Sequence, residues 1–271
     1  MLQGYQTALG ISALILAAGA SRADIIVSGS FGPNGDVGFV NSPPSLSIAF
    51  GPGSQGSIYQ MDGFAYADGM TWNGLDSGGP SRELTDGTPP GIAYSFNASQ
   101  PTVDQLLLTY TFINNSAQAL TNFQFMYFAD PDIGSTYTDE WATVAGSLGF
   151  GLTGYQVGDP GLSTIFTNLD NGTLSNMNEE PATNPGDVAT ALGFQLNSLS
   201  IGGGATFQVL MSDDLSSIGS FSVTQHDPVY TDHTLTLSGQ LVAPEPSSLA
   251  LFGAGLIALV FIGRYRKSRV V

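Results

Sequence analysis

The residues best suited to chemistry form an acidic group near the middle of the chain. Asp130, Asp132, Asp139 and Glu140 place four carboxylates within eleven residues, directly after an aromatic segment. Ca²⁺ takes about six to eight oxygen ligands, so this group is a candidate calcium site. The EF-hand pattern is not met, because Gly134 occupies the position of an acidic ligand and the glutamate comes one position early. An acidic, solvated loop without an ion is the alternative.

Groups that could carry out catalysis are sparse. The two histidines, His226 and His233, each adjoin an aspartate, and they flank Pro228. Two imidazoles with two carboxylates are a ligand set for a transition metal, although hydrated histidines in a turn explain the same residues. The chain has neither a Gly-x-Ser-x-Gly nor a His-Glu-x-x-His motif, and it has no cysteine. We therefore expect no enzymatic activity and no catalytic residues.

Trp72 is the candidate residue for contact with a sugar. It lies in the glycine-containing segment 69–74, with Tyr59 and Tyr66 earlier in the chain. An exposed aromatic ring can stack on the apolar face of a sugar, whereas a tryptophan buried in the core is the structural alternative. A carbohydrate-binding module is therefore an open interpretation of this region.

The distribution of charge limits the partners of the chain. The 271 residues include 6 Lys or Arg and 22 Asp or Glu, which gives a formal net charge of -16. Residues 24–243 contain all but one of the acidic residues and a single basic residue, Arg82. A region this acidic repels a phosphate backbone, which excludes nucleic acid as a partner and favours cations.

Apolar residues alternate with polar ones in several segments of residues 24–243. The clearest segments are residues 103–113, 121–128, 192–196, 205–211 and 235–241. Polar residues 114–118 separate the first two segments and predict that they form a hairpin. The pattern predicts a mainly β fold, a single antiparallel β-sandwich of the immunoglobulin-like or jelly-roll type with long Gly/Pro-rich loops. The segments resemble immunoglobulin-like segments of secreted bacterial proteins, which bears on the fold alone.

The N-terminus has the features of a signal peptide. Residues 8–20 form a thirteen-residue apolar run, which suits the hydrophobic region of a secretory signal and is short for a bilayer span. Ser21 and Ala23 place small side chains at the -3 and -1 positions of a cleavage site before Asp24. A buried helix of the fold is the alternative. We expect signal peptidase to remove residues 1–23 and the remainder to be exported.

The C-terminus combines a proline-rich segment, an apolar segment and basic residues. Residues 249–262 carry no charge, and they lie between Pro244-Glu245-Pro246 and a basic cluster at residues 264–269. At about 1.5 Å per residue, such a helix covers only about two-thirds of a ~30 Å hydrocarbon core. We therefore predict a marginal transmembrane helix at about residues 249–263, with the basic tail in the cytoplasm and the N-terminus outside.

The order of Pro244, Glu245 and Pro246, a short apolar helix and an Arg-rich terminus resembles the PEP-CTERM protein-sorting signal. The same motif is also labelled the ice-binding protein C-terminal domain, a label that transfers no ice binding. The resemblance is confined to residues 244–271. It implies that an exosortase, a membrane transpeptidase, processes the chain at the Pro-Glu-Pro region. It also implies an inner-membrane intermediate and then the cell surface or extracellular matrix of a Gram-negative bacterium.

Together these features predict an exported surface or extracellular-matrix protein. We expect residues 24–243 to act as a non-enzymatic structural component of the exopolysaccharide or biofilm layer. A carbohydrate-binding module, or an enzyme that processes polysaccharide, is the alternative. Calcium is the one cofactor that the sequence suggests.

Overall fold

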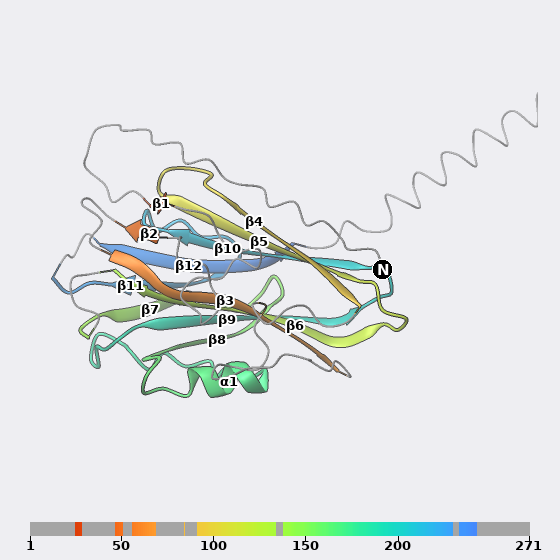
Figure 1. Cartoon of the computed structure of the whole chain (residues 1–271). Coiled ribbons are helices and arrows are strands. Elements are labelled where there is room, and N and C mark those ends of the chain that lie inside the picture. Colours follow the sequence, from red (N-terminus) through yellow and green to blue (C-terminus); the bar gives the residue numbers. More distant parts are fainter. Residues whose placement is uncertain are drawn as a thin grey trace, which may run out of the picture.

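The computed structural model describes residues 25–28, 47–50, 56–68, 84, 91–133, 138–229 and 233–242. These residues form twelve strands and one helix (Figure 1). The elements are β1 (Ile26–Ser28), β2 (Ser47–Phe50), β3 (Gly56–Asp68), β4 (Ile92–Ser99), β5 (Gln105–Asn114), β6 (Leu120–Asp132), β7 (Trp141–Gly146), β8 (Leu152–Gly158), α1 (Ile165–Asn171), β9 (Ala189–Leu199), β10 (Gly204–Ser212), β11 (Phe221–His226) and β12 (Thr234–Val242).

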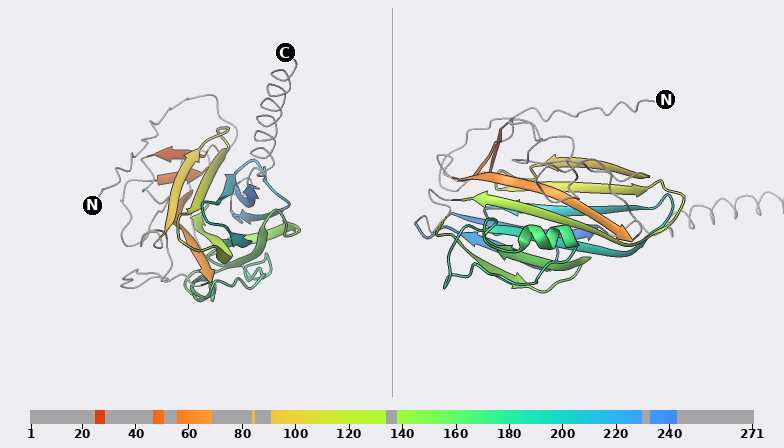
Figure 2. Two further views of the ribbon diagram at one scale, coloured as in Figure 1. Left: turned by 90° about the vertical axis from the view of Figure 1, so that its right-hand side faces the viewer. Right: turned by 60° about the horizontal axis from the view of Figure 1, so that its bottom comes forward.

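The strands form two six-stranded sheets, and every pair of neighbours is antiparallel. The first sheet has the order β1-β2-β3-β6-β9-β8, and the second has the order β4-β5-β10-β12-β11-β7. Figure 2 shows the two sheets as two layers. The prediction of a mainly β, antiparallel fold is confirmed, whereas the immunoglobulin-like or jelly-roll type stays a prediction.

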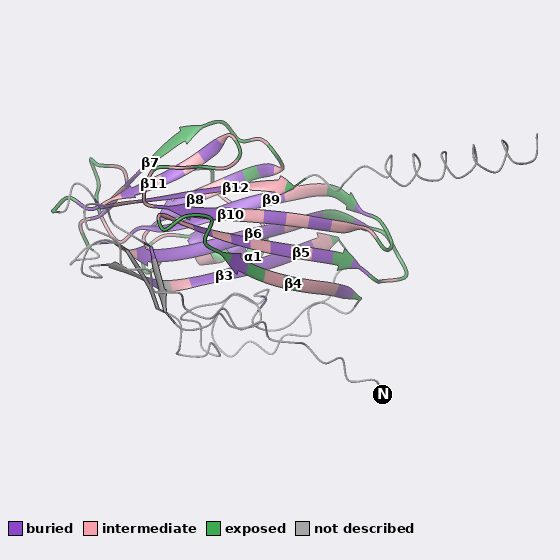
Figure 3. Ribbon diagram, turned by 90° about the horizontal axis from the view of Figure 1, so that it is seen from above, coloured by how far each residue is buried: buried purple, intermediate pink, exposed green. Residues whose placement is uncertain are grey.

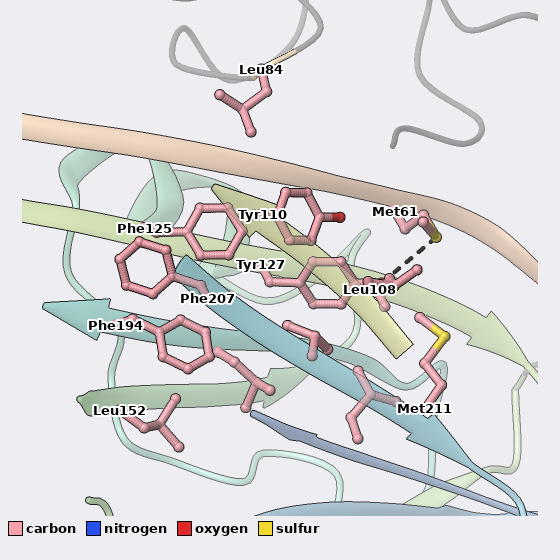
Figure 4. Packing of buried hydrophobic residues seen from close by; sticks show 14 of the residues in the cluster. Met61, Leu84, Leu108, Tyr110, Phe125, Tyr127, Leu152, Phe194, Phe207 and Met211 are labelled. Carbon is pink, nitrogen blue, oxygen red and sulfur yellow. Dashed lines mark hydrogen bonds between the residues drawn. The ribbon is translucent and has the colours of Figure 1, made fainter. Parts of the chain in front are cut away.

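Aromatic side chains from both sheets fill the space between the layers (Figure 4). Phe125 of β6 lies with its ring centroid 4.7 Å from that of Tyr110 on β5 and 5.1 Å from that of Phe207 on β10. All three residues are fully buried. Buried residues follow the strands, and exposed ones gather at the turns (Figure 3). The alternation seen in the sequence therefore identifies the residues that face the core.

The predicted hairpin of residues 103–113 and 121–128 is wrong. The first segment is β5, which pairs with β4 and β10, and the second is β6, which pairs with β3 and β9 in the other sheet. The two aromatic faces meet across the core instead of lying side by side. The buried Asn114 holds the crossing, because its side-chain amide donates to the carbonyl oxygens of Gln118 and Leu199, both at 2.9 Å. Alternation shows which face a residue occupies, but it does not show which strand is its neighbour.

Helix α1 covers the outer face of the first sheet. Its buried Ile165 and Leu169 pack in one cluster with Phe64 of β3 and Phe128 of β6. Gly172 ends the helix in the left-handed conformation, with φ 68°, which suits a residue without a Cβ atom. Sequence periodicity did not indicate this seven-residue helix, nor β3 or β8. Because α1 packs on the outer face of the first sheet, β6 and β9 carry apolar residues on both faces where the helix covers them.

Several predicted features lie outside the described residues. They are the signal peptide 1–23 with its cleavage site at Ala23 and Asp24, Trp72, the Pro244-Glu245-Pro246 segment and the membrane helix at about 249–263. Within the described ranges, no helix has the length and apolar character that crossing a membrane requires.

Candidate functional site

The end of β6 carries the acidic residues of the site. Strand β6 alternates between core residues such as Tyr127 and Ala129 and residues of the outer face such as Phe128. Asp130 and Asp132 continue the outer face, because residues two apart on a strand share one side. Pro131 lies between them and has no N–H to donate to a neighbouring strand. Opposite this point the pairing of β3 with β6 is irregular, with a register shift between Ile58 and Gln60.

Asp187 completes the group from a distant part of the chain. It lies two residues before β9, which runs antiparallel to β6 with Ala129 opposite Thr190. Continuing this register places Asp187 opposite Asp132. One carboxylate oxygen from each of Asp130, Asp132 and Asp187 lies within 4.8 Å of the other two. We call these three residues the carboxylate triad.

The triad is shielded from water to different degrees. Asp130 is only 2% exposed, and Asp132 and Asp187 are half-buried. The Oδ1 atoms of Asp130 and Asp187 are buried and have no hydrogen-bond partner among the described residues. Buried polar atoms in proteins nearly always have a partner, so these two oxygens call for a ligand or a proton.

Glu140 lies beside the triad and fastens the surrounding segments together. Its Oε1 accepts a 2.8 Å hydrogen bond from the backbone N–H of Ile133, and its Oε2 accepts one from the side-chain amide of Gln225. The backbone N–H of Gly186 donates to the carbonyl oxygen of Glu140 at 2.8 Å. Gln225 belongs to β11, so this carboxylate links the end of β6 to the second sheet. Glu140 is thus a tether whose two oxygens already accept hydrogen bonds from the protein.

The carboxyl groups repel one another in a region without positive charge. Burial raises the pKa of Asp130 to about 8, and the charge of Asp187 adds to the increase. Burial also raises the pKa of Glu140 to about 8, although the hydrogen bonds from Ile133 and Gln225 act against it. The pKa of Asp187 rises to about 6 by burial and by repulsion from Asp132. The described residues contain no lysine or arginine that could offset these charges.

These shifts predict that the chain loses stability as pH rises when divalent cations are removed. The groups facing Asp130 and Glu140 are Asp132, Asp159, Asp187 and Gln225, with Glu180 acting on Asp187. Because the folded pKa values exceed the ordinary values, the folded state binds more protons than the unfolded state above about pH 4. The free energy of unfolding therefore falls as pH rises from about 4 to about 8, by an amount on the order of several kcal/mol.

The measurement is the melting temperature of the full-length chain in detergent with excess chelator, from pH 5 to pH 8.5. We expect a steady decrease over this range. His226 acts in the opposite direction near its own pKa, which burial lowers, so the comparison is with Asp130→Asn. That variant should show a shallower decrease. A melting temperature that is flat or rises with pH in the unmodified chain contradicts the prediction.

The structure brings together only part of the acidic group predicted from the sequence. Asp130 and Asp132 belong to the triad, and Glu140 lies next to it as a tether. Asp139 is not a member of the triad. Asp187 was missed, because it lies 55 residues after Asp132 and only the pairing of β6 with β9 makes them neighbours. Its one sequence signal is its place directly before an alternating segment.

Among the described residues, His226, His233 and Asp227 do not form a group that could hold a metal ion, and Asp232 lies outside the described residues. His226, on the outer face of the second sheet, stacks on Trp141, with ring centroids 4.0 Å apart and an interplanar angle of 11°. Its Nε2 lies 3.1 Å from Oγ1 of Thr143. His233 is buried before β12. The half-buried Trp141 is thus an outward-facing aromatic residue that sequence reasoning did not single out.

Comparison with known proteins identifies one segment. Residues 242–267 match the family model of the PEP-CTERM protein-sorting motif. The recognition of this motif from Pro244, Glu245 and Pro246 is therefore confirmed. The motif indicates an exosortase as processing partner and export to the cell envelope or surface. No curated protein and no solved structure matches the chain.

Proposed function

We propose that the chain is a non-enzymatic structural protein of the extracellular polysaccharide or biofilm layer of a Gram-negative bacterium. The observation that carries the proposal is the PEP-CTERM sorting motif at residues 242–267. In this proposal, signal peptidase removes residues 1–23, and the helix at about 249–263 holds an inner-membrane intermediate. An exosortase then processes the Pro-Glu-Pro region and releases the folded β domain to the surface.

The outer face of the second sheet supports an association with polysaccharide. Three cross-strand pairs on this face join uncharged polar side chains. Two of them are Thr111 with Thr206 at 3.1 Å and Gln240 with Gln208 at 3.0 Å. The third, Thr224 with Thr236 at 3.0 Å, offers only Thr224 to a ligand, because Thr236 is buried. Hydroxyl and amide groups both donate and accept hydrogen bonds, as sugar hydroxyls do. These pairs contain no carboxylate, so the hydrogen-bonding groups themselves carry no charge.

Fractionation of the native host tests this role. We expect the processed protein to separate with the extracellular polysaccharide, and we expect that polysaccharide to keep its chain-length distribution during incubation with the protein. A structural protein changes the cohesion of the layer but not its covalent bonds. Shortening of the polysaccharide would contradict the non-enzymatic role, and recovery of the protein only with membranes would contradict the location.

A carbohydrate-binding module is the second candidate, and the stack of Trp141 on His226 favours it. Trp141 lies half-buried at the start of the edge strand β7, and an aromatic ring at such a position can stack on the apolar face of a sugar. If the chain binds sugar through Trp141, it should be retained on insoluble polysaccharide. The Trp141→Ala variant should lose this retention. Trp72→Ala tests the residue chosen from the sequence in the same way. Phe150→Ala is the control, because it removes an aromatic side chain, 65% exposed, that lies after β7 and outside the stack.

A further inference from the structure

We propose that Asp130, Asp132 and Asp187 bind a divalent cation, and that calcium is the ion that this site fits. The three carboxylates come from the end of β6 and from the segment before β9. An ion held between them joins two strands that are neighbours in the first sheet. The site differs from the loop predicted from the sequence, because a distant residue, Asp187, replaces Asp139.

The buried oxygen of Asp130 points to a ligand independently of the clustering. Acidic side chains cluster on many surfaces without an ion, but there water solvates them. Here Asp130 is 2% exposed, and its Oδ1 has no hydrogen-bond partner in the described structure. The Oδ1 atom of Asp187 is in the same situation. Since buried charges are stabilised by a counter-charge or by a metal, a cation between these oxygens meets the requirement of both.

The chemistry of the ligands selects the ion. All three ligands are carboxylate oxygens, which hard cations prefer, whereas zinc and copper prefer sites with nitrogen or sulfur. The triad oxygens lie within 4.8 Å of one another, so one cation can contact all three. Calcium accepts a flexible geometry of about six to eight oxygen ligands, whereas magnesium requires a near-ideal octahedron and retains its water ligands more strongly.

Glu140 and its contacts prepare the site without supplying a ligand. The hydrogen bonds of Glu140 to Ile133, Gln225 and Gly186 hold the residues on both sides of the triad in place. This support reduces the ordering that binding would otherwise require. Calcium is therefore expected to stabilise the folded chain at this end of the first sheet.

Calcium titration of the full-length chain in detergent, after treatment with chelator and its removal, tests the proposal. At a calcium concentration about 100 times the dissociation constant, the melting temperature should rise by roughly 5–10 °C. Magnesium at the same concentration should raise it less. Calorimetry should give one calcium ion bound per chain at this site.

Variants assign the effect to the triad. Asp187→Asn should weaken calcium binding by about tenfold or more, because affinity depends on the number of charged ligands. Asp132→Asn should do the same. Asp130→Asn should abolish the calcium response while leaving the calcium-free melting temperature unchanged or higher, since the neutral amide needs no counter-charge. That last pair of results cannot arise from a failure to fold.

Two control variants separate the triad from other acidic residues. Asp68→Asn removes the same charge from the opposite end of the β3–β6 pair, where Asp68 lies opposite Thr121 and Asp130 lies opposite Gln60. The separation is roughly 30 Å along the strand. Asp139→Asn tests the member predicted from the sequence that lies outside the triad. Both variants should keep the calcium response.

The proposal is overturned by either of two results. One is an unmodified chain whose melting temperature and calorimetric signal do not respond to calcium. The other is a response that persists at full affinity in Asp187→Asn and Asp130→Asn. Loss of the response in Asp68→Asn as well would indicate general screening of the acidic surface, and it would also overturn the site.

Discussion

Replacing Pro244, Glu245 and Pro246 with alanine is expected to leave nearly all of the chain unprocessed in the inner membrane. Residues 242–267 match the PEP-CTERM sorting motif, and these three residues are its Pro-Glu-Pro segment. Proline restricts its own backbone and that of the residue before it, so alanine at these positions changes the conformational preference of the segment. The substitution also removes the charge of Glu245, but it leaves the apolar segment 249–262 unchanged. Immunoblots of inner-membrane and surface fractions measure the outcome.

The matched control is the double substitution Ser247→Ala and Ser248→Ala. It changes the two residues that follow the motif and keeps both prolines and the glutamate. This control should appear at the surface at its normal processed size. If the alanine variant of the Pro-Glu-Pro segment reached the surface at that same size, exosortase recognition through this segment would be wrong.

Phe125→Ala is expected to destabilise the folded domain by about 3–5 kcal/mol. Phe125 is fully buried at the centre of the core, and its ring lies near four other aromatic rings from both sheets. They are those of Tyr110 at 4.7 Å, Phe207 at 5.1 Å, Phe112 at 5.5 Å and Phe194 at 5.9 Å. Truncation removes buried apolar area and leaves a cavity that rigid neighbouring rings cannot fill. Urea unfolding of the full-length chain in detergent, followed by circular dichroism, measures the loss.

Phe150→Ala removes the same side chain from a position that is 65% exposed. Its cost should stay within about 0.5 kcal/mol, because no cavity forms at the surface. Equal effects of the two substitutions would show that Phe125 does not lie in a packed core. They would then contradict the packing of the two sheets against each other.

The carboxylate triad shows how far sequence reasoning reaches at one site. Asp130 and Asp132 were predicted because they belong to four carboxylates within eleven residues that follow an aromatic segment. Asp139 and Glu140 were grouped with them because they are near in sequence. In the structure Glu140 accepts hydrogen bonds as a tether, whereas Asp187 enters the triad through strand pairing. Proximity in sequence therefore predicted two of the three members of the triad, and sheet topology supplied the third.

The strand pattern shows the same division. Alternation in residues 103–113 and 121–128 correctly identifies the core residues of β5 and β6. It predicted a hairpin between them, but the two strands belong to different sheets. Helix α1 was missed because seven residues are too few for a clear helical period, and its two buried residues depend on the sheet beneath them.

The sequence by itself determined the sorting motif, the excess of negative charge and the faces of the main strands. These properties depend only on the type and order of residues that are near one another in the sequence. A processing enzyme recognises such a short segment, and the alternation of side chains along one strand depends on the same local order. The tertiary structure alone decided which strands are neighbours, which carboxylates are buried and which of them meet. The physical reason is that burial and strand pairing join residues far apart in the chain. The unpaired oxygen of Asp130 and its approach to Asp187 exist only once β6 and β9 lie side by side.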